Sequence, residues 1–561
     1  MTFRLPRLLS SSREWLEQQQ SSILSAATII TAANIISSLS GVVRQRLLIS
    51  HFFDTPASRQ SFEAFLVAFQ IPDMMFQLIV LGTISAAFIP VLAMYKNDQQ
   101  EQNRYINSMM NSVLLIFLIF SVVVFIWAEP FTRFRTGQAF TDEQVRVAAK
   151  LTRIMVCAQF FFAISNFMTG MLQSYKRFII PALSPILYNL GILLGAYLLS
   201  DRFGIYAAGI GVVFGAFLHM LIQLPLAWKL GFRFRPALDL KHPGVRTTYK
   251  LTPARTFSLA ITQLQQLANG YFTTSIGNLS YVVINLAFSL MTMPIRFFGV
   301  PIGQAALPFL SDEADQHDLG RFRDLLLKSI HQISFFAFPA AVLLLILRIP
   351  IVRIAYGTHN FPWSTTLITG RVVAIISISI AAQAIVQLLV RAFHALKDTH
   401  TPLVITVTVG LMYLLMCWIS VFVFHWGVIG MAIAISVSTI SEMLMFLFAL
   451  DRRIKGFASK AFWFPQIKMI IASFLMAVFL YLPFRILDEL VFDTSRTIEL
   501  ILLTVSTGTV GMLVYIYFAM LFDIRELYIL QTMWDKFGSW QKTIAKSKEV
   551  IIENHADGDE L

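Results

Sequence analysis

Four ionisable side chains lie within two strongly apolar stretches near the start of the chain: Arg44, Arg46, Glu63 and Asp73. An ionisable group inside a membrane span costs on the order of 2.5–3.5 kcal/mol on insertion scales, so such groups usually face a water-filled cavity. The chemistry that they indicate is the binding of a charged solute inside the membrane. A plainer alternative stays open, in which Arg46 extends to the membrane interface and Glu63 only marks a helix end.

The composition requires a membrane protein. Of 561 residues 56% are hydrophobic, only 14% are charged and 50 are Phe. This is too apolar for a soluble protein of this length. The net charge of +12 does not indicate nucleic-acid binding, because the basic residues lie in short links between apolar runs, where membrane topology explains them.

The sequence contains no signature of an enzyme. Walker, nucleophile-elbow and HExxH motifs and paired catalytic carboxylates are all lacking, so we expect neither catalysis nor a cofactor. The two cysteines, Cys157 and Cys417, lie in apolar runs and predict no disulfide framework. No Cys/His cluster predicts a metal site.

The charged residues lie on long apolar segments that we expect to form membrane helices. A span needs about 20 apolar residues, and runs of this length predict about fourteen membrane helices. The predicted spans are 23–50, 62–93, 105–128, 147–173, 180–200, 204–228, 252–276, 280–310, 326–347, 364–391, 401–424, 427–450, 464–486 and 498–522. Lys and Arg concentrate in alternate links, which predicts that both chain ends are cytoplasmic.

An internal repeat divides these helices. The sequence LQSYKRFIIPALSPILYNL, from Leu172, matches RAFHALKDTHTPLVITVTV, from Arg391, and each places a short basic link before a proline that opens an apolar helix. The repeat predicts two similarly oriented lobes of six helices, as in several transporters. The predicted parts are a cytoplasmic segment 1–21, an N-lobe 22–230, a C-lobe 231–451, two further helices in 452–522 and a cytoplasmic tail 523–561.

The motifs spread along these helices resemble those of one family. They are SLSGVVRQRLL, EAFLVAFQIPDMMF, AAFIPVL, SYKRFIIPALSPILYNLGI, FGVPIGQAALPFLSD and AFHALKDTHTP, in this order. This combination is similar to the MurJ (MviN) lipid II flippases, which belong to the multidrug/oligosaccharidyl-lipid/polysaccharide (MOP) exporter superfamily. The resemblance implies two pseudo-symmetric lobes around a central cavity. It also implies that the last two helices form a groove for a polyprenyl tail.

The resemblance further implies a function. A flippase of this family moves a lipid II-like precursor with an undecaprenyl-pyrophosphate head group across the bacterial inner membrane by alternating access. Its partners would be this lipid-linked glycan precursor, membrane lipids and proteins of cell-wall synthesis. Two alternatives stay open: a MOP exporter of another polyprenyl-linked glycan or small substrate, and a transport-inactive scaffold for cell-wall synthesis.

The resemblance, together with the polar residues in apolar runs, predicts the lining of the cavity. The predicted residues are Arg44, Glu63, Ser38, Gln77, Gln263, Gln266, Asn269, Ser289 and Arg296. The chain has fewer cavity arginines than the family: Ser38, Gln77 and Ser289 stand where arginines are usual. A pyrophosphate needs cations or many donors, and Arg44 and Arg296 supply the cations. Two alternatives to these cavity roles stay open. Arg296 would lie at a helix end or at the membrane interface, and the amide side chains would form hydrogen bonds between helices.

Overall fold

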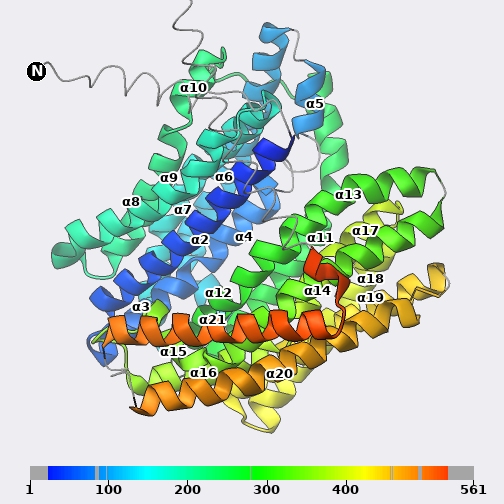
Figure 1. Ribbon diagram of the computed structural model, residues 1–561. Helices are drawn as coiled ribbons and strands as arrows, with labels where there is room; N and C mark the ends of the chain where they lie inside the picture. Colours follow the sequence, from blue (N-terminus) through cyan, green and yellow to red (C-terminus); the bar gives the residue numbers. More distant parts are fainter. Residues whose placement is uncertain are drawn as a thin grey trace, which may run out of the picture. The chain divides into compact units, whose positions relative to one another are not determined.

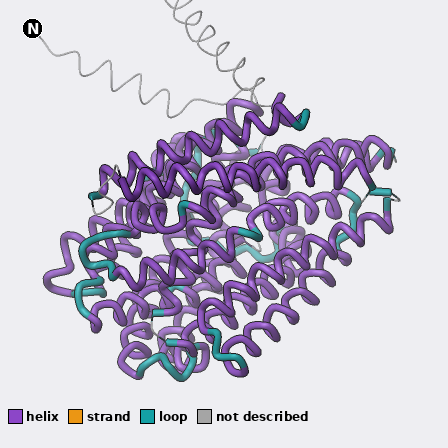
Figure 2. The backbone as a smooth tube through the Cα atoms, turned by 60° about the horizontal axis from the view of Figure 1, so that its bottom comes forward, coloured by secondary structure: helices purple, strands orange, loops and turns teal. Residues whose placement is uncertain are grey.

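The computed structural model describes residues 23–81, 88–95, 98–277, 279–316, 318–454, 456–457, 459–490 and 496–528. All regular secondary structure in these ranges is helical (Figure 2). The prediction of an all-α fold is therefore confirmed. The predicted segment 1–21 and most of the predicted tail lie outside the described residues.

The chain forms two compact units by its contacts, and each is described by itself. The first unit comprises the described parts of Met1–Phe297, Arg348–Ser379 and Thr399–Glu442; the second comprises those of Phe298–Leu347, Ile380–Asp398 and Met443–Leu561. The first unit contains helices from both predicted lobes, so the division into lobes stays a prediction.

The helices of the first unit start with α2 and end with α19, which continues into the second unit. They are α2 (Ile23–Phe52), α3 (Pro56–Ala68), α4 (Gln70–Phe76), the π-helix η1 (Gln77–Leu81), α5 (Ile89–Met94), α6 (Gln99–Arg135), α7 (Asp142–Ser174), α8 (Ile179–Phe203), α9 (Tyr206–Leu221), α10 (Leu224–Lys229), α11 (Pro243–Ile276), α12 (Ser280–Pro294), α15 (Arg348–Tyr356), α16 (Trp363–Ser377), α18 (His400–Trp418), η4 (Ile419–Val423) and most of α19 (Gly427–Arg453).

The second unit is smaller. After the π-helix η3 (Ile295–Gly299), its helices are α13 (Val300–Asp315), α14 (Leu319–Ile346), α17 (Ile380–Ala395), α20 (Lys460–Leu490), α21 (Thr497–Leu521) and the short 3₁₀ helix η5 (Arg525–Leu527). Helices α20 and α21 run side by side and pack against α14 (Figure 1).

The helices are long and apolar enough for a multi-pass membrane protein. Among the described residues eleven helices pass a test of length and hydropathy for a membrane span, or twelve if the bent pair α16–α17 is one span. The predicted spans 23–50 and 252–276 coincide with α2 and α11, which do not pass this test. The number of fourteen spans therefore stays a prediction.

Helices α8 and α9 pack closely because glycines line both sides of their contact. A Cβ atom added to Gly191 would lie 2.3 Å from the Cα of Gly215, and one added to Gly195 would lie 2.3 Å from the Cα of Gly211. Both pairs have the spacing that lets membrane helices approach at their backbones. A larger residue at these positions would separate α8 from α9.

The predicted repeat has a counterpart in the backbone. Helix α7 ends in a turn in which Lys176 adopts a left-handed conformation (φ 59°) and the Arg177 N–H donates to the Leu172 carbonyl at 2.9 Å. Helix α17 ends in the same way, with Lys397 at φ 57° and the Asp398 N–H bonded to the Phe393 carbonyl at 2.9 Å. This is a Schellman-type C-cap, and it occurs where the two sequence motifs align.

Candidate functional site

Contacts between the two predicted lobes gather at one end of the first unit. There the Gly137 N–H donates to Thr274 Oγ1 at 2.8 Å, and Asn360 Nδ2 donates to the Ser50 carbonyl at 2.7 Å. We call this end the link end, because four links between consecutive helices meet there. These links are 53–55, 136–141, 277–279 and 357–362.

Glu63 forms hydrogen bonds that join helices at the link end. It is 4% exposed, and its two carboxylate oxygens accept hydrogen bonds from Gln144 Nε2 at 3.0 Å and from the backbone N–H of Tyr281 at 3.1 Å. Gln144 is oriented by a capping box at the start of α7, where its Oε1 accepts from the Thr141 N–H at 3.0 Å. Because that oxygen is occupied, the amide NH₂ group of Gln144 faces Glu63.

The carboxylate also caps a helix of the other predicted lobe. Helix α12 begins after Leu279, which adopts a left-handed conformation and offers no side-chain cap. Tyr281 is the second residue of α12, where an N–H has no partner within the helix. Glu63 of α3 supplies the missing acceptor, and the helix dipole favours its negative charge.

A buried arginine supports the helix that carries Glu63. Pro72 has no N–H, so the Ala68 carbonyl loses its helical partner and α3 breaks before α4. Thr152 Oγ1 donates to this carbonyl at 3.3 Å. Arg135, 5% exposed at the end of α6, donates from Nη2 to the neighbouring Val67 carbonyl at 2.8 Å. The described start of the predicted span 62–93 thus divides into α3 and α4, and carbonyls at this division accept hydrogen bonds from α6 and α7.

Arg46 joins α2 to α15. Its Nη1 donates to the Arg353 carbonyl at 3.3 Å and to the Ile354 carbonyl. Both carbonyls belong to the last turn of α15, where the helix dipole favours a cation. Arg46 therefore binds backbone of the other predicted lobe, which neither expectation for this residue included.

Arg44 lies in the second half of α2. Its Nη1 donates to Asn189 Oδ1 of α8 at 2.9 Å, and Asn189 Nδ2 donates to Ser40 Oγ at 2.7 Å. Within the described residues Arg44 has no carboxylate partner, and its buried Nε has no hydrogen-bond acceptor. A buried cation with a free donor and no counter-ion is suited to binding an anion.

Only some predicted residues are brought together. Tyr356 of α15 lies near two of them, because it interacts electrostatically with Arg44 of α2 and with Ser289 of α12. Its hydroxyl donates to the Leu286 carbonyl of α12 at 3.1 Å. Among the contacts of the described residues, none joins Arg44, Glu63 and Arg296 to one another.

The remaining predicted residues differ in exposure. Ser38 and Gln77 are half-buried, Gln263 is buried, and Gln266, Ser289 and Arg296 are exposed. Asn269 accepts a hydrogen bond from the Tyr413 hydroxyl of α18 at 3.0 Å, as expected for an amide that joins helices. The two cavities that we describe, of about 870 and 680 Å³, are lined by none of the predicted residues.

Several residues of the site had no strong signal in the sequence. Arg135 closes an apolar run much as Arg44 does, so the same criterion could have identified it. Gln144 and Asn189 are neutral residues at unremarked positions, and only their partners in space reveal their roles. Among the described residues no group of His, Cys, Asp and Glu has the arrangement of a metal site.

A bundle of long apolar helices that encloses charged side chains is the architecture of a polytopic membrane transporter. The profile of the family described as Lipid II flippase MurJ matches residues 51–526. The chain belongs to this family.

Individual relatives and solved structures agree with the family. The chain is 28% identical to a lipid II flippase MurJ of Burkholderia cenocepacia over 76% of this chain and 84% of that one. It is 24% identical to a probable lipid II flippase MurJ of Bdellovibrio bacteriovorus over 91% and 97%. Its fold matches a MurJ structure in an inward closed conformation with a TM-score of 0.72 at 23% identity, over 88% of this chain and 98% of that one. It also matches an inward-facing MATE transporter of the MOP superfamily with a TM-score of 0.61 at 13% identity, over 77% and 98%.

Proposed function

We propose that the chain is a flippase that moves a lipid II-like precursor, with an undecaprenyl-pyrophosphate head group, from the cytoplasmic to the outer leaflet of the bacterial inner membrane. Membership in the family supports this function, and the Burkholderia relative carries the name lipid II flippase. The observation that carries the mechanism is the closed link end, at which helices of both predicted lobes are bonded through Glu63 and Arg46.

The described state fits one half of an alternating-access cycle. The excess of Lys and Arg in alternate links places both chain ends in the cytoplasm and the link end on the outer side. With the link end closed, the substrate would reach the cavity from the cytoplasm. Opening would break the bonds of Glu63 to Tyr281 and of Arg46 to α15, each a charge-assisted contact of about 1.5–3 kcal/mol.

Arg44 is the residue that we assign to the pyrophosphate. Its guanidinium is held by one neutral amide, that of Asn189, and has no carboxylate partner within the described residues. A phosphate oxygen could therefore bind without breaking an ion pair. Ser38, Gln77, Gln263, Gln266, Asn269, Ser289 and Arg296 complete the proposed cavity, and the helices in 452–522 complete the proposed groove for the polyprenyl tail.

Rescue of a bacterium depleted of its own lipid II flippase tests this proposal. We expect the chain to restore growth and the Arg44→Ala variant to fail at equal membrane abundance. Arg321→Ala is the matched control, because Arg321 forms an exposed ion pair with Asp318 at 3.4 Å. Lack of rescue by the abundant unmodified chain would contradict the function, and full rescue by Arg44→Ala would contradict the role of Arg44.

A further inference from the structure

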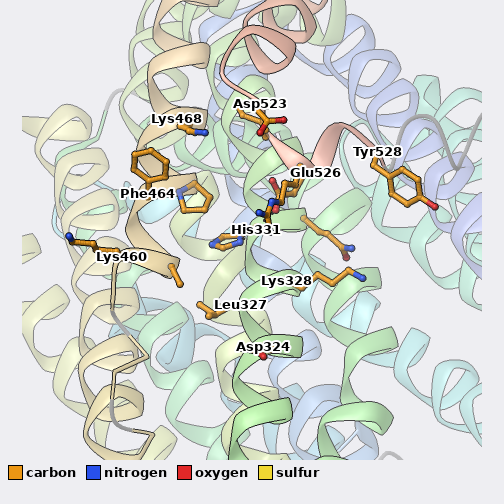
Figure 3. A pocket seen from close by; sticks show the side chains of 15 residues that line it. Asp324, Leu327, Lys328, His331, Lys460, Phe464, Lys468, Asp523, Glu526 and Tyr528 are labelled. Atoms are coloured by element: carbon orange, nitrogen blue, oxygen red, sulfur yellow. Dashed lines mark ion pairs between the residues drawn. The ribbon is translucent and has the colours of Figure 1, made fainter.

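A cavity of about 870 Å³ lies in the second unit, and its lining includes none of the residues assigned to the pyrophosphate. Its walls come from α14, α20 and the segment that follows α21 (Figure 3). In this view His331 and Glu526 lie at the centre of the lining side chains, with Phe464 and Lys468 on one side and Lys328 on another. We asked which ligand these side chains fit.

The segment after α21 is firmly attached. Helix α21 ends in a Schellman-type cap, with Asp523 at φ 51° and the Ile524 N–H bonded to the Ala519 carbonyl at 2.9 Å. Ile524 is 5% exposed and packs in an apolar cluster with Phe335. The wall that this segment gives to the cavity is therefore built before any ligand binds.

A second contact joins Glu526 to His331 of α14. Its carboxylate lies 3.6 Å from Nδ1 of His331, which is 7% exposed, while Nε2 of His331 faces the Phe462 carbonyl at 3.3 Å. Nε2 is thus the donor to the carbonyl, and Nδ1 donates to the carboxylate when His331 is in its doubly protonated, charged form. Glu526 serves as an anchor of the segment.

The cavity is rich in cations that form no ion pair within the described part of the chain. Lys328, Lys460, Lys468 and Arg525 line it, and none of them forms an ion pair with a carboxylate of the described residues. Of the other carboxylates of the lining, Asp523 lies on the same side of the view as Lys468, and Asp324 lies at the opposite side (Figure 3). The cations are thus available to an anionic ligand.

The rest of the lining is apolar and continues onto a lipid-facing surface. Lys468 lies on α20, a candidate membrane span, and its Nζ is 4.8 Å from the centre of the Phe464 ring. Phe464 is 62% exposed, and farther along α20 Phe474 is 65% exposed. A lysine at the end of a span places its charge at the head-group level while its stem covers apolar surface. The ligand therefore needs an anionic head and apolar chains.

We propose that this cavity binds an anionic glycerophospholipid from the leaflet at this end of α20. Its phosphate contacts Lys328, Lys468 and Arg525, and its acyl chains lie along α20 beyond Phe464. Basic pockets between membrane helices recognise head groups of this kind. The lining of the site includes none of the residues assigned to the pyrophosphate, and the bound lipid joins α14, α20 and the segment after α21.

Native mass spectrometry of the full chain tests the site, with phosphatidylglycerol and phosphatidylcholine offered together in equal amounts. We expect phosphatidylglycerol to be preferred, and the Lys328→Gln/Lys468→Gln/Arg525→Gln variant to lower this preference about tenfold or more, since each basic residue near a membrane surface attracts anionic lipid appreciably. The control variant Arg321→Gln/Lys397→Gln/Arg452→Gln removes three charges of the second unit outside the cavity and should keep the preference. Lys328→Arg/Lys468→Arg retains the charge and should also keep it.

Three results would overturn the proposal: an unchanged preference in the triple Gln variant, displacement of phosphatidylglycerol by excess inorganic phosphate, or lipid binding that appears only when the chain is truncated after Tyr528. The second result would indicate a site for free anions, and the third would indicate that the tail fills the cavity. The measurement involves no transport, so its failure leaves the proposed flippase function untouched, and failed rescue of growth leaves this site untouched.

Discussion

Replacing Glu63 by glutamine tests whether the contacts at the link end stabilise the closed state. The carboxylate accepts from Gln144 and from the Tyr281 N–H, one bond to each oxygen. The glutamine side chain keeps one acceptor oxygen and presents an NH₂ group in place of the other. Because the oxygen of Gln144 is already bonded to Thr141, one of the two donors must then face another donor.

The magnitude follows from these contacts. Loss of one charge-assisted hydrogen bond in a buried site weakens the closed state by about 2 kcal/mol. This changes the ratio of closed to open molecules about thirtyfold. If closed molecules outnumber open ones about thirtyfold in the unmodified protein, the two states would be about equally populated in the variant.

The assay is a distance measurement between spin labels on the two predicted lobes. Ala57 and His359 are exposed at the link end, and the native Cys157 and Cys417 are replaced by alanine first. We expect Glu63→Gln to add a population at longer distance. Glu143→Gln is the control, because Glu143 forms an exposed ion pair with Arg146 at 2.9 Å. An unchanged distance distribution in folded Glu63→Gln protein would refute our account of the closure.

Three further changes probe the scaffold. Arg135→Ala removes a buried donor to the Val67 carbonyl and to the Gln70 side chain and should destabilise the fold by about 2 kcal/mol, seen as a lower midpoint of thermal unfolding; an unchanged midpoint would contradict this role. Gly195→Val brings a side chain against Gly211 and should reduce folded protein in the membrane by overpacking of about 3 kcal/mol, whereas Gly41→Ala, with open space around it, should not. Asn189→Ala frees Arg44 without removing its charge, so it should impair rescue of growth less than Arg44→Ala does.

The sequence predicted the all-α fold because the length of each apolar run and the polar links between the runs indicate membrane helices directly. It could not predict the break within 62–93, because the consequence of Pro72 depends on donors from Arg135 and Thr152, far away in the chain. It also could not predict that the predicted span 364–391 is bent by 48° at the break between α16 and α17.

The candidate site was predictable in part, for a physical reason. A charged residue inside an apolar run can be recognised from the sequence alone, so Arg44 and Glu63 were predicted as residues of the site. The partner of each charged side chain depends on which helices folding brings together. The hydrogen bond from the Tyr281 N–H of α12 to Glu63 and the contact of Arg46 with α15 were therefore not predicted. The neutral residues Gln144 and Asn189 act only through such partners.

Translocation by the purified chain tests the central claim most directly. The chain is reconstituted into vesicles that contain lipid II with a fluorescent head group on the inner and outer leaflets, and a membrane-impermeant quencher is added. We predict that vesicles with the chain lose nearly all fluorescence, whereas vesicles with Arg44→Ala, like empty vesicles, retain the inner-leaflet half. Retention of that half by vesicles containing the folded, unmodified chain would contradict the account.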